Sequence, residues 1–454
     1  MRAPAVGLAV AAATVALGAS ALAGGGSGSS GIGDPFFPQA GNGGYDVSRY
    51  SLKLRLGKKA RRLRARAKIE AVATQDLRRF NLDYRGPGVR KVKVGGRRAR
   101  FRQRKSELKI RPRASIAAGE RFSVVVRYRG KPRAITDPEG AREGWIRTDD
   151  GAYVAGEPTG SETWFPSNDH PTDKAAFAFR VNVPRGMKAI ANGRLERRAK
   201  RRRRTTFVWR EEDPMAPYLA TVTTGRFGLT RSTVAGTRSV VAVDPRERSA
   251  GVRRTPEILS LFESLFGPYP FDDLGAVVDH RGAGYALETQ TRPLYDGSPA
   301  DGLVAHELAH QWFGNSVSLE RWDQIWLNEG FATWAQWRWS QQDGGPTTAE
   351  RFDDLYATPG SDNEFWNPPP DALPAPRQLF DGTVYVRGGM TLEVLRQEVG
   401  DATFLEIMRE WAARYAYANA TTADFIALAE EISGQALDQL FDDWLFEQGK
   451  PPPP

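Results

Sequence analysis

The chain has 454 residues, too many for one ordinary hydrophobic core, so two domains are expected. Hydrophobic residues make up 40% of it and charged residues 26%, a balance typical of globular proteins that bury a sizeable core. The sequence contains no cysteine, which excludes disulfide bonds, thiolate metal sites, a cysteine nucleophile and a lipid-modified cysteine anchor.

The net charge of +10 conceals two halves of opposite sign. Residues 1–245 contain 49 basic and 21 acidic residues, whereas residues 246–454 contain 15 basic and 33 acidic residues. Two domains explain this split better than one nucleic-acid-binding surface. The basic residues gather in runs at Arg61–Arg64, Arg97–Arg104 and Arg197–Arg204. These runs could make weak contact with a polyanion, but few aromatic residues accompany them for stacking on bases, so we favour solvated hairpin loops.

The first residues have the features of an export signal. Met1 and Arg2 form a short basic start, Val6–Ala19 is apolar and alanine-rich, and Ala21–Ala23 offers a small-x-small cleavage site. The apolar run is too short to span a bilayer comfortably, and no later segment is apolar enough to do so. We therefore predict a signal peptide over 1–23, a flexible linker over 24–44 and a secreted protein, with the cell envelope as the alternative location.

Residues 45–244 show short alternations of apolar and polar residues, broken by glycine, proline and charged turns. The clearest alternations are Tyr50–Leu56, Phe122–Tyr128 and Phe177–Val183. This pattern predicts an all-β domain over residues 45–244.

After residue 244 the apolar residues recur at helical spacing. Thr255–Phe266 is predicted as a helix and Gly275–Asp279 as a buried strand. Further helices are predicted at Leu303–Phe313, Leu327–Gln341, Thr391–Val399, Thr403–Ala416 and Thr422–Glu431. Residues 245–449 are thus expected to form a second, mainly helical domain, followed by a proline-rich tail over 450–454.

Two of the four histidines, His306 and His310, lie four residues apart in a His-Glu-Leu-Ala-His segment. On a helix this spacing places both imidazoles on one face, where they can reach one metal ion. Zinc needs a third protein ligand and an open position, and Glu329 is the natural candidate, with Asn328 as a cap of its helix. The alternative, two structural histidines in a chance match, is less favoured because a helix-borne glutamate follows at a workable distance.

A zinc site of this kind predicts hydrolytic chemistry. Zinc lowers the pKa of a bound water, and Glu307, between the two histidines, would accept the proton. The attack creates negative charge on the carbonyl oxygen, which needs a further hydrogen-bond donor. The spacing alone does not distinguish cleavage at the end of a peptide from cleavage in its middle.

The His-Glu-x-x-His segment, followed at this distance by Asn-Glu-Gly-Phe-Ala from Asn328, resembles the zinc aminopeptidases of the aminopeptidase N and leukotriene hydrolase type, which are gluzincins. The similarity runs from about Tyr45 to Gly449 and includes the stretches Trp164–Pro171 and Phe266–Asp272. It implies one zinc ion and an α+β multidomain fold, in which a saddle-like all-β domain precedes a thermolysin-like, mainly helical peptidase domain. Larger relatives continue into a further helical domain, so this chain resembles a short two-domain form, for which we expect a more open cleft.

The resemblance assigns roles to three further residues. Tyr385, in Tyr-Val-Arg-Gly, matches the family's Tyr-x-Lys-Gly motif and would stabilise the oxyanion, with Arg387 in place of lysine. Glu288 aligns with the glutamate of the family's Gly-x-Met-Glu-Asn motif, which binds the free α-amine of the substrate. Of that motif only Ala286 and Glu288 are unchanged, which leaves the side-chain preference open. Glu157 matches a second amine-binding position, or is a surface residue at a turn.

These assignments predict a zinc-dependent aminopeptidase acting on peptides with a free amino terminus, with no nucleic-acid partner. Two alternatives remain at this stage. One is a zinc endopeptidase that does not require a free amine. The other is a cell-envelope protein that binds polyanions and carries a degenerate metal site.

Overall fold

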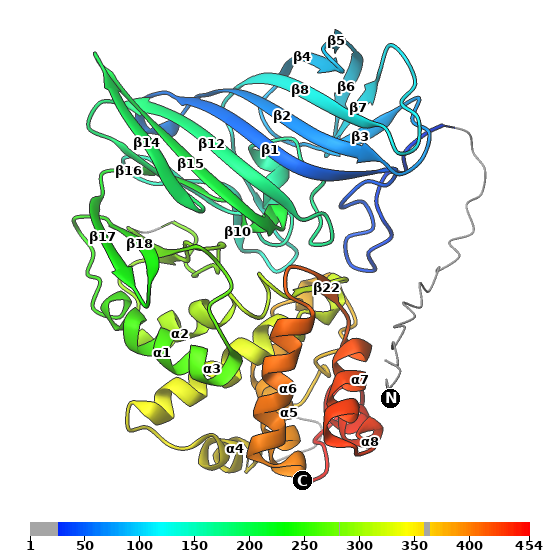
Figure 1. The fold of residues 1–454 in the computed structure, drawn as a ribbon, viewed down its shortest axis with the longest axis vertical. Coiled ribbons are helices and arrows are strands. Elements are labelled where there is room, and N and C mark those ends of the chain that lie inside the picture. The colour runs from blue at the N-terminus through cyan, green and yellow to red at the C-terminus, as the bar shows by residue number, and fades with distance from the viewer. Residues whose placement is uncertain (1–25, 281, 358–363) are drawn as a thin grey trace, which may run out of the picture.

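The computed structural model describes residues 26–280, 282–357 and 364–454. A β-rich half stands on a mainly helical half (Figure 1). This arrangement confirms the predicted α+β multidomain fold. The predicted signal peptide lies outside the described residues. Within those residues, no helix is both long enough and apolar enough to cross a membrane.

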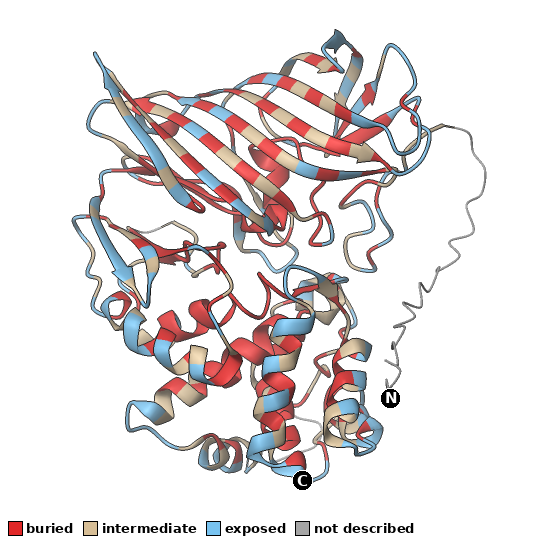
Figure 2. Cartoon of the chain, viewed as in Figure 1, coloured by how far each residue is buried: buried red, intermediate tan, exposed pale blue. Residues whose placement is uncertain are grey.

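The largest element of the β-rich half is a sheet of eight strands. Its order is β14 (Arg194–Arg201), β15 (Arg204–Met215), β12 (Ala175–Pro184), β1 (Tyr45–Leu56), β2 (Leu63–Ala73), β8 (Arg121–Gly130), β4 (Val89–Val94) and β5 (Arg97–Arg98). All neighbours are antiparallel except β1 and β12, which are parallel. Buried and exposed residues alternate along its central strands (Figure 2), so one face meets the core and the other meets solvent.

Two smaller sheets complete this half. One contains β13 (Lys188–Ala191), β16 (Val222–Gly225), β11 (Ala152–Ala155), β10 (Arg142–Arg147) and β9 (Ala134–Thr136), in that order. The other contains β3 (Phe80–Asp83), β7 (Glu107–Arg111) and β6 (Arg100–Arg104). Short 3₁₀ turns occur at Lys58–Ala60, Gly160–Thr163 and Pro217–Leu219. Large aromatic side chains, including Trp145, Trp164 and Trp209, are fully buried in the core of this half.

A four-stranded sheet lies beside the helices. Its order is β17 (Gly228–Val234), β18 (Thr237–Val243), β19 (Asp273–Asp279) and β20 (Leu294–Asp296). The predicted domain division at residue 244 lies between β18 and β19, which pair in parallel. Because β17 and β18 form one sheet with β19 and β20, strand pairing alone would place the division between the domains before β17.

The helical half contains α1 (Thr255–Phe266), α2 (Asp301–Ala309), α3 (Trp326–Gln342), α4 (Thr348–Tyr356), α5 (Gly382–Val399), α6 (Asp401–Arg414), α7 (Thr422–Ser433) and α8 (Asp438–Phe441). Short 3₁₀ turns at Val252–Arg254, Trp322–Gln324 and Pro376–Gln378, the strands β21 (Ser318–Leu319) and β22 (Asn419–Ala420), and a π turn over Asp442–Phe446 connect and follow these helices. The helix predicted over Leu303–Phe313 ends early, at Ala309, because the chain turns towards Gly314, whose φ is 123°.

Polar contacts join the two halves. Asp34 accepts hydrogen bonds from the backbone nitrogen of Trp322 at 2.9 Å and faces the Nε2 atom of His170 at 3.2 Å. Lys174, just before β12, donates to the backbone oxygens of Asn315, Ser316 and Ala418. These contacts fix the β-rich half against the loops that follow α2 and precede α7.

Candidate active site and metal centre

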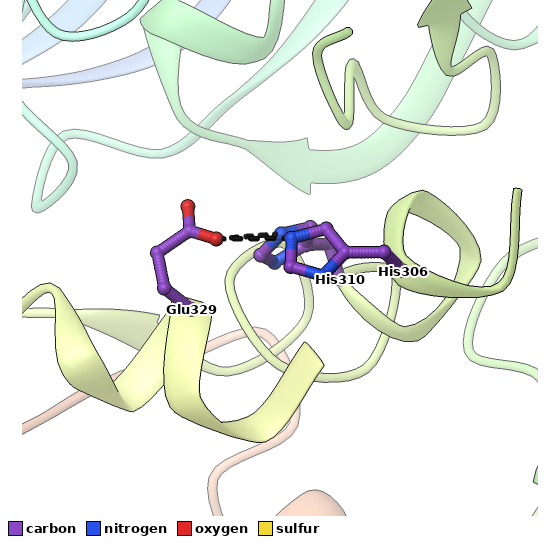
Figure 3. Close-up of side chains that lie close together, drawn as sticks. All are labelled: His306, His310 and Glu329. Atoms are coloured by element: carbon purple, nitrogen blue, oxygen red, sulfur yellow. Dashed lines mark hydrogen bonds and ion pairs between the residues drawn. The ribbon is translucent and has the colours of Figure 1, made fainter. Parts of the chain in front are cut away.

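The three predicted metal ligands lie together (Figure 3). His306 comes from α2, His310 from the residue that ends it, and Glu329 from the first turn of α3. The Oε2 atom of Glu329 is 3.1 Å from Nε2 of His306 and 3.4 Å from Nε2 of His310. All three side chains are buried, and one donor atom from each lies within 4.8 Å of the others. Two imidazole nitrogens and one carboxylate oxygen form the donor set of a catalytic zinc site.

Hydrogen bonds orient the histidine rings. The Nδ1 atom of His310 donates to the backbone oxygen of Phe313 at 3.1 Å, which leaves Nε2 free as a ligand. Gln336, on α3, lies near the side chain of His306 and opposes the lowering of its pKa by burial. The expectation that Asn328 caps this helix is wrong, because α3 already begins at Trp326 and Asn328 lies buried inside its first turn.

The charges of the ligand group are strongly coupled. Burial alone would raise the pKa of Glu329, but the neighbouring His310 and His306 outweigh it and lower that pKa to about 2. Burial disfavours the charged form of His310, but Glu329, Glu288 and Glu307 outweigh it and raise its pKa to about 10. The carboxylates around the site therefore attract positive charge, which favours a divalent cation.

Glu307 and Tyr385 face the same centre. Glu307 is buried, and its burial raises its pKa well above the ordinary value, with His310 opposing the shift. The ring of Tyr385, from α5, stacks near the ring of His306, with the centroids 6.0 Å apart and the planes inclined by 25°. Burial and then the nearby carboxylates raise the pKa of Tyr385, so its hydroxyl keeps its proton and remains a hydrogen-bond donor.

Glu157 and Glu288 bring two more buried carboxylates to this centre. They are 7% and 2% exposed, and the Oε1 atom of each lacks a hydrogen-bond partner among the described residues. Burial raises the pKa of both side chains. Tyr218, from the β-rich half, lies beside the carboxylate of Glu288 and opposes the rise in its pKa. Unpaired carboxylate oxygens of this kind can accept hydrogen bonds from an ammonium group.

A cavity of about 440 Å³ contains all of these groups. Its lining is Asp137, Glu139, Ala141, Glu157, Tyr285, Ala286, Glu288, Leu303, His306, Glu307, His310, Glu329, Gln336, Phe380 and Tyr385. Six carboxylates line it, and within the described part of the chain neither lysine nor arginine does. The connection from β9 to β10 reaches the cavity from the β-rich half, where Glu139 accepts a hydrogen bond from the backbone nitrogen of Phe380.

Two glycines set the distance between the helices that carry Glu329 and Tyr385. A methyl group added to Gly330 on α3 would lie 2.8 Å from the carbonyl carbon of Gly388 on α5. Real side chains do not approach backbone so closely, so α3 and α5 cross at this point only because neither residue has a side chain. The glycines of the Asn-Glu-Gly and Tyr-x-Arg-Gly segments therefore bring the third ligand and the tyrosine to one site.

Arg387 plays a different part from its neighbour Tyr385. Its guanidinium is fully buried and donates to five backbone oxygens, those of Trp366, Asp443, Trp444, Glu447 and Gly449. Burial lowers its pKa to about 10. Arg387 therefore holds the segment Asp443–Gly449, which follows α8, against α5, and it does not line the cavity.

Several lining residues escaped the sequence-based prediction. Gln336 follows Glu329 by seven residues on one helix, and this spacing could have identified it as a neighbour on the same face. Asp137 and Glu139, which line the cavity, and Tyr218, which lies beside Glu288, gave no comparable signal, because only the packing of the two halves brings them to the site.

The fold and site define a class of protein: a zinc metallopeptidase of the gluzincin type, with a His-Glu-x-x-His helix, a glutamate ligand from a second helix and a β-rich domain against the cleft. Residues 285–444 match the peptidase family M1 domain, and residues 47–219 match the peptidase M1 N-terminal domain. The chain belongs to peptidase family M1. Zinc is the metal of this family's metallopeptidases, and the buried His306, His310 and Glu329 fit it.

Similar proteins include plant, animal and archaeal aminopeptidases. Aminopeptidase M1-B of Oryza sativa subsp. japonica is 30% identical over 63% of this chain and 36% of its own length. Leucyl aminopeptidase of Saccharolobus solfataricus is 25% identical over 89% of this chain and 54% of its own length. The chain thus spans little more than a third of the length of the plant relatives that it matches.

A solved structure covers nearly all of the chain. The M1 zinc metallopeptidase from Deinococcus radiodurans superposes with a TM-score of 0.84 at 27% identity, over 93% of this chain and 98% of that one. A mutant of that protein bound to a Tyr-Ser-Ala substrate superposes with a TM-score of 0.85. A further mutant structure, described as a two-domain M1 zinc metallopeptidase, is bound to L-arginine.

Proposed function

We propose that the protein is a zinc-dependent aminopeptidase that removes N-terminal residues from peptides. The observation that carries this proposal is the pair of buried carboxylates, Glu157 and Glu288, in the same cavity as the metal ligands. Each has an oxygen without a partner among the described residues, and a free α-ammonium group would satisfy both. A neutral amide in mid-chain offers no such charge.

The chain's own groups would divide the chemistry between them. Zinc held by His306, His310 and Glu329 would polarise the scissile carbonyl and lower the pKa of the attacking water. Glu307 would take the proton of that water and pass it to the leaving nitrogen. The hydroxyl of Tyr385 donates a hydrogen bond to the carbonyl oxygen as negative charge develops on it.

A panel of aminoacyl substrates, each tested free and N-acetylated, separates this proposal from the endopeptidase alternative. Free substrates should be cleaved far faster than acetylated ones, since acetylation removes the charge that Glu157 and Glu288 would bind. Equal cleavage of free and acetylated substrates would show an endopeptidase. Loss of activity on chelation, with recovery on adding zinc, distinguishes either enzyme from a binding protein with a degenerate metal site.

We also propose that the protein is secreted, with the cell envelope as the alternative location. The support is the basic start, the apolar run and the small-x-small segment within residues 1–23. Amino-terminal sequencing of protein recovered from medium and from cells should find Gly24 first in the exported form. An uncleaved Met1 in the medium would contradict the proposal.

Weak contact between the arginine-rich loops and polyanions is a further proposal. The run Arg197–Arg204 forms the end of β14, the start of β15 and the exposed turn between them. Replacing Arg201, Arg202 and Arg203 by glutamine should lower the salt concentration that elutes the protein from heparin. Unchanged elution would leave these residues as a solvated hairpin.

A further inference from the structure

A row of cationic side chains crosses the solvent face of the eight-stranded sheet. The register pairs Lys53 of β1 with Arg180 of β12 and with Arg66 of β2. Arg66 is paired in turn with Arg127 of β8, and Arg127 with Lys91 of β4. Five like charges therefore lie side by side across five strands, over about 19 Å at the usual strand spacing.

A second row lies two residues further along the same strands. Arg55 of β1 is paired with Arg64 of β2, and Arg64 with Arg129 of β8. The two rows are about 7 Å apart, the rise of two residues in a strand. Between them the surface is hollowed by about 470 Å³.

Seven cations and no carboxylate line this hollow. They are Lys53, Arg55, Arg64, Arg66, Arg90, Arg127 and Arg129, and within the described ranges none of these seven side chains forms a hydrogen bond or ion pair. We call these seven residues the cationic hollow. Figure 1 shows its strands, β1, β2, β8 and β4, at the end of the molecule away from the helices. None of the seven lines the catalytic cavity.

An arginine-biased composition does not explain the cationic hollow by itself. Other cations of the same two strands are paired with carboxylates, since Arg49 of β1 is 2.5 Å from Glu212 of β15, and Lys68 of β2 is 2.6 Å from Glu70. Like charges directly opposite each other on neighbouring strands destabilise a sheet. In the cationic hollow the positive side chains repel one another without a neighbouring carboxylate, whereas cations elsewhere on the same strands are paired. Unpaired cations of this kind are what a binding site for an anionic ligand needs.

We propose that the cationic hollow binds a linear polymer of phosphate or phosphodiester groups that lies across the strands. Guanidinium groups suit this ligand because their fork of N–H donors matches phosphate oxygens. Nucleic acid is a poorer fit, because the one aromatic residue of the lining, Tyr128, is 1% exposed and offers bases no ring to stack on. Bound polymer would hold the protein on an anionic surface while the catalytic cavity stays open.

The test compares two triple variants of the full chain that lose the same charge. One replaces Arg64, Arg66 and Arg127 by glutamine; the control replaces Arg226, Arg231 and Arg248, which are exposed outside the cationic hollow. Binding is titrated over a range of salt with inorganic polyphosphate, with poly(glycerol phosphate), and with an oligothymidylate of equal charge. The first two ligands distinguish a free phosphate polymer from a surface phosphodiester polymer.

Wild type and control should bind the phosphate polymers equally well. The hollow variant should bind about a hundredfold more weakly at low salt. Its plot of log K against log salt should be less steep by about 2, because three phosphate contacts are lost. Its melting temperature should be equal or higher, because repulsion is relieved, and its cleavage of a short peptide should not change.

Three results would overturn the proposal. The first is equal polymer binding by wild type and hollow variant, or none by wild type. The second is tighter binding of oligothymidylate than of polyphosphate, which would assign the hollow to nucleic acid. The third is low-salt self-association that the hollow variant loses, without polymer binding, which would assign the hollow to the acidic half of a second copy.

Discussion

The Nζ atom of Lys174 lies 2.8 Å from the backbone oxygen of Ser316, so a lysine of the β-rich half binds the loop that follows the ligand His310. The same nitrogen also donates to the backbone oxygens of Asn315 and Ala418. Asn315 in turn donates from Nδ2 to the backbone oxygen of Glu288 at 2.7 Å. One lysine side chain thus joins the β-rich half, which carries Glu157, to the segment that carries Glu288.

Lys174→Met should destabilise the protein and weaken its activity together. Three backbone oxygens would lose their donor, and the free energy of unfolding should fall by about 2 kcal/mol or more. KM should rise because Glu157 and Glu288 are no longer held in place relative to each other. Urea unfolding and steady-state kinetics measure the two effects. Lys131→Met, an exposed lysine of the same half, should change neither.

Gly330→Ala should separate α3 from α5. The new methyl group would lie 2.8 Å from the carbonyl carbon of Gly388, so one helix must move. We expect lower zinc affinity and lower kcat, because Glu329 and Tyr385 lie on the two sides of this contact. Gly382→Ala is the matched control, since its added methyl meets no atom within 4 Å. If both variants retained wild-type zinc affinity and kcat, the contact would not set the site's geometry.

Glu288→Gln should lower kcat/KM for substrates with a free amine by about a hundredfold, because a charge-assisted hydrogen bond to the ammonium is lost. The slow cleavage of an N-acetylated substrate should stay the same, which separates amine binding from general damage. Glu320→Gln, at an exposed position nearby in the sequence, serves as the control. An equal loss on both substrates would show that Glu288 has another role.

Tyr385→Phe should reduce kcat by about 100- to 1000-fold with little change in KM, since the hydroxyl acts on charge that develops during the reaction. Zinc content, measured by atomic emission, should be unchanged because the hydroxyl is not a ligand. Tyr415→Phe alters a tyrosine outside the cavity and should be neutral. A large rise in KM instead would place Tyr385 in ground-state binding.

Glu143→Gln should change how stability depends on pH. Burial raises the pKa of Glu143 to about 8, although Thr159 donates to it from its backbone and hydroxyl groups. The unfolded chain releases this proton near pH 4.5, whereas the folded protein keeps it until about pH 8. Between these two pH values the contribution of Glu143 to the free energy of unfolding therefore falls as pH rises. In this range Glu143 lowers the free energy of unfolding by up to about 1.4 kcal/mol for each pH unit.

Since glutamine cannot ionise, the variant should match wild type near pH 4 and be more stable above pH 8. Urea unfolding at several pH values measures the difference. Parallel curves for the two proteins would show that Glu143 does not titrate in this range.

The metal ligands were predictable because a four-residue helical spacing and a third ligand on a nearby helix are local features of the sequence. The all-β half was predictable from its alternation. The first half of α5 was not, because Gly382, Gly388 and Gly389 are poor helix formers, and packing against α3 overrides that propensity. The contributions of Tyr218 and Glu139 depend on how the two halves meet, which no short pattern encodes.

The five hydrogen bonds of Arg387 have a consequence for comparison with relatives. Its guanidinium has five N–H groups, and the structure shows five accepting backbone oxygens. The lysine of the family's Tyr-x-Lys-Gly motif has only three, so it would leave at least two of these buried oxygens without a donor. Exchange of arginine for lysine here is therefore not a conservative replacement. The residue and the backbone path over Asp443–Gly449 must change together, and a chimera that takes only one of them should misfold locally at this segment.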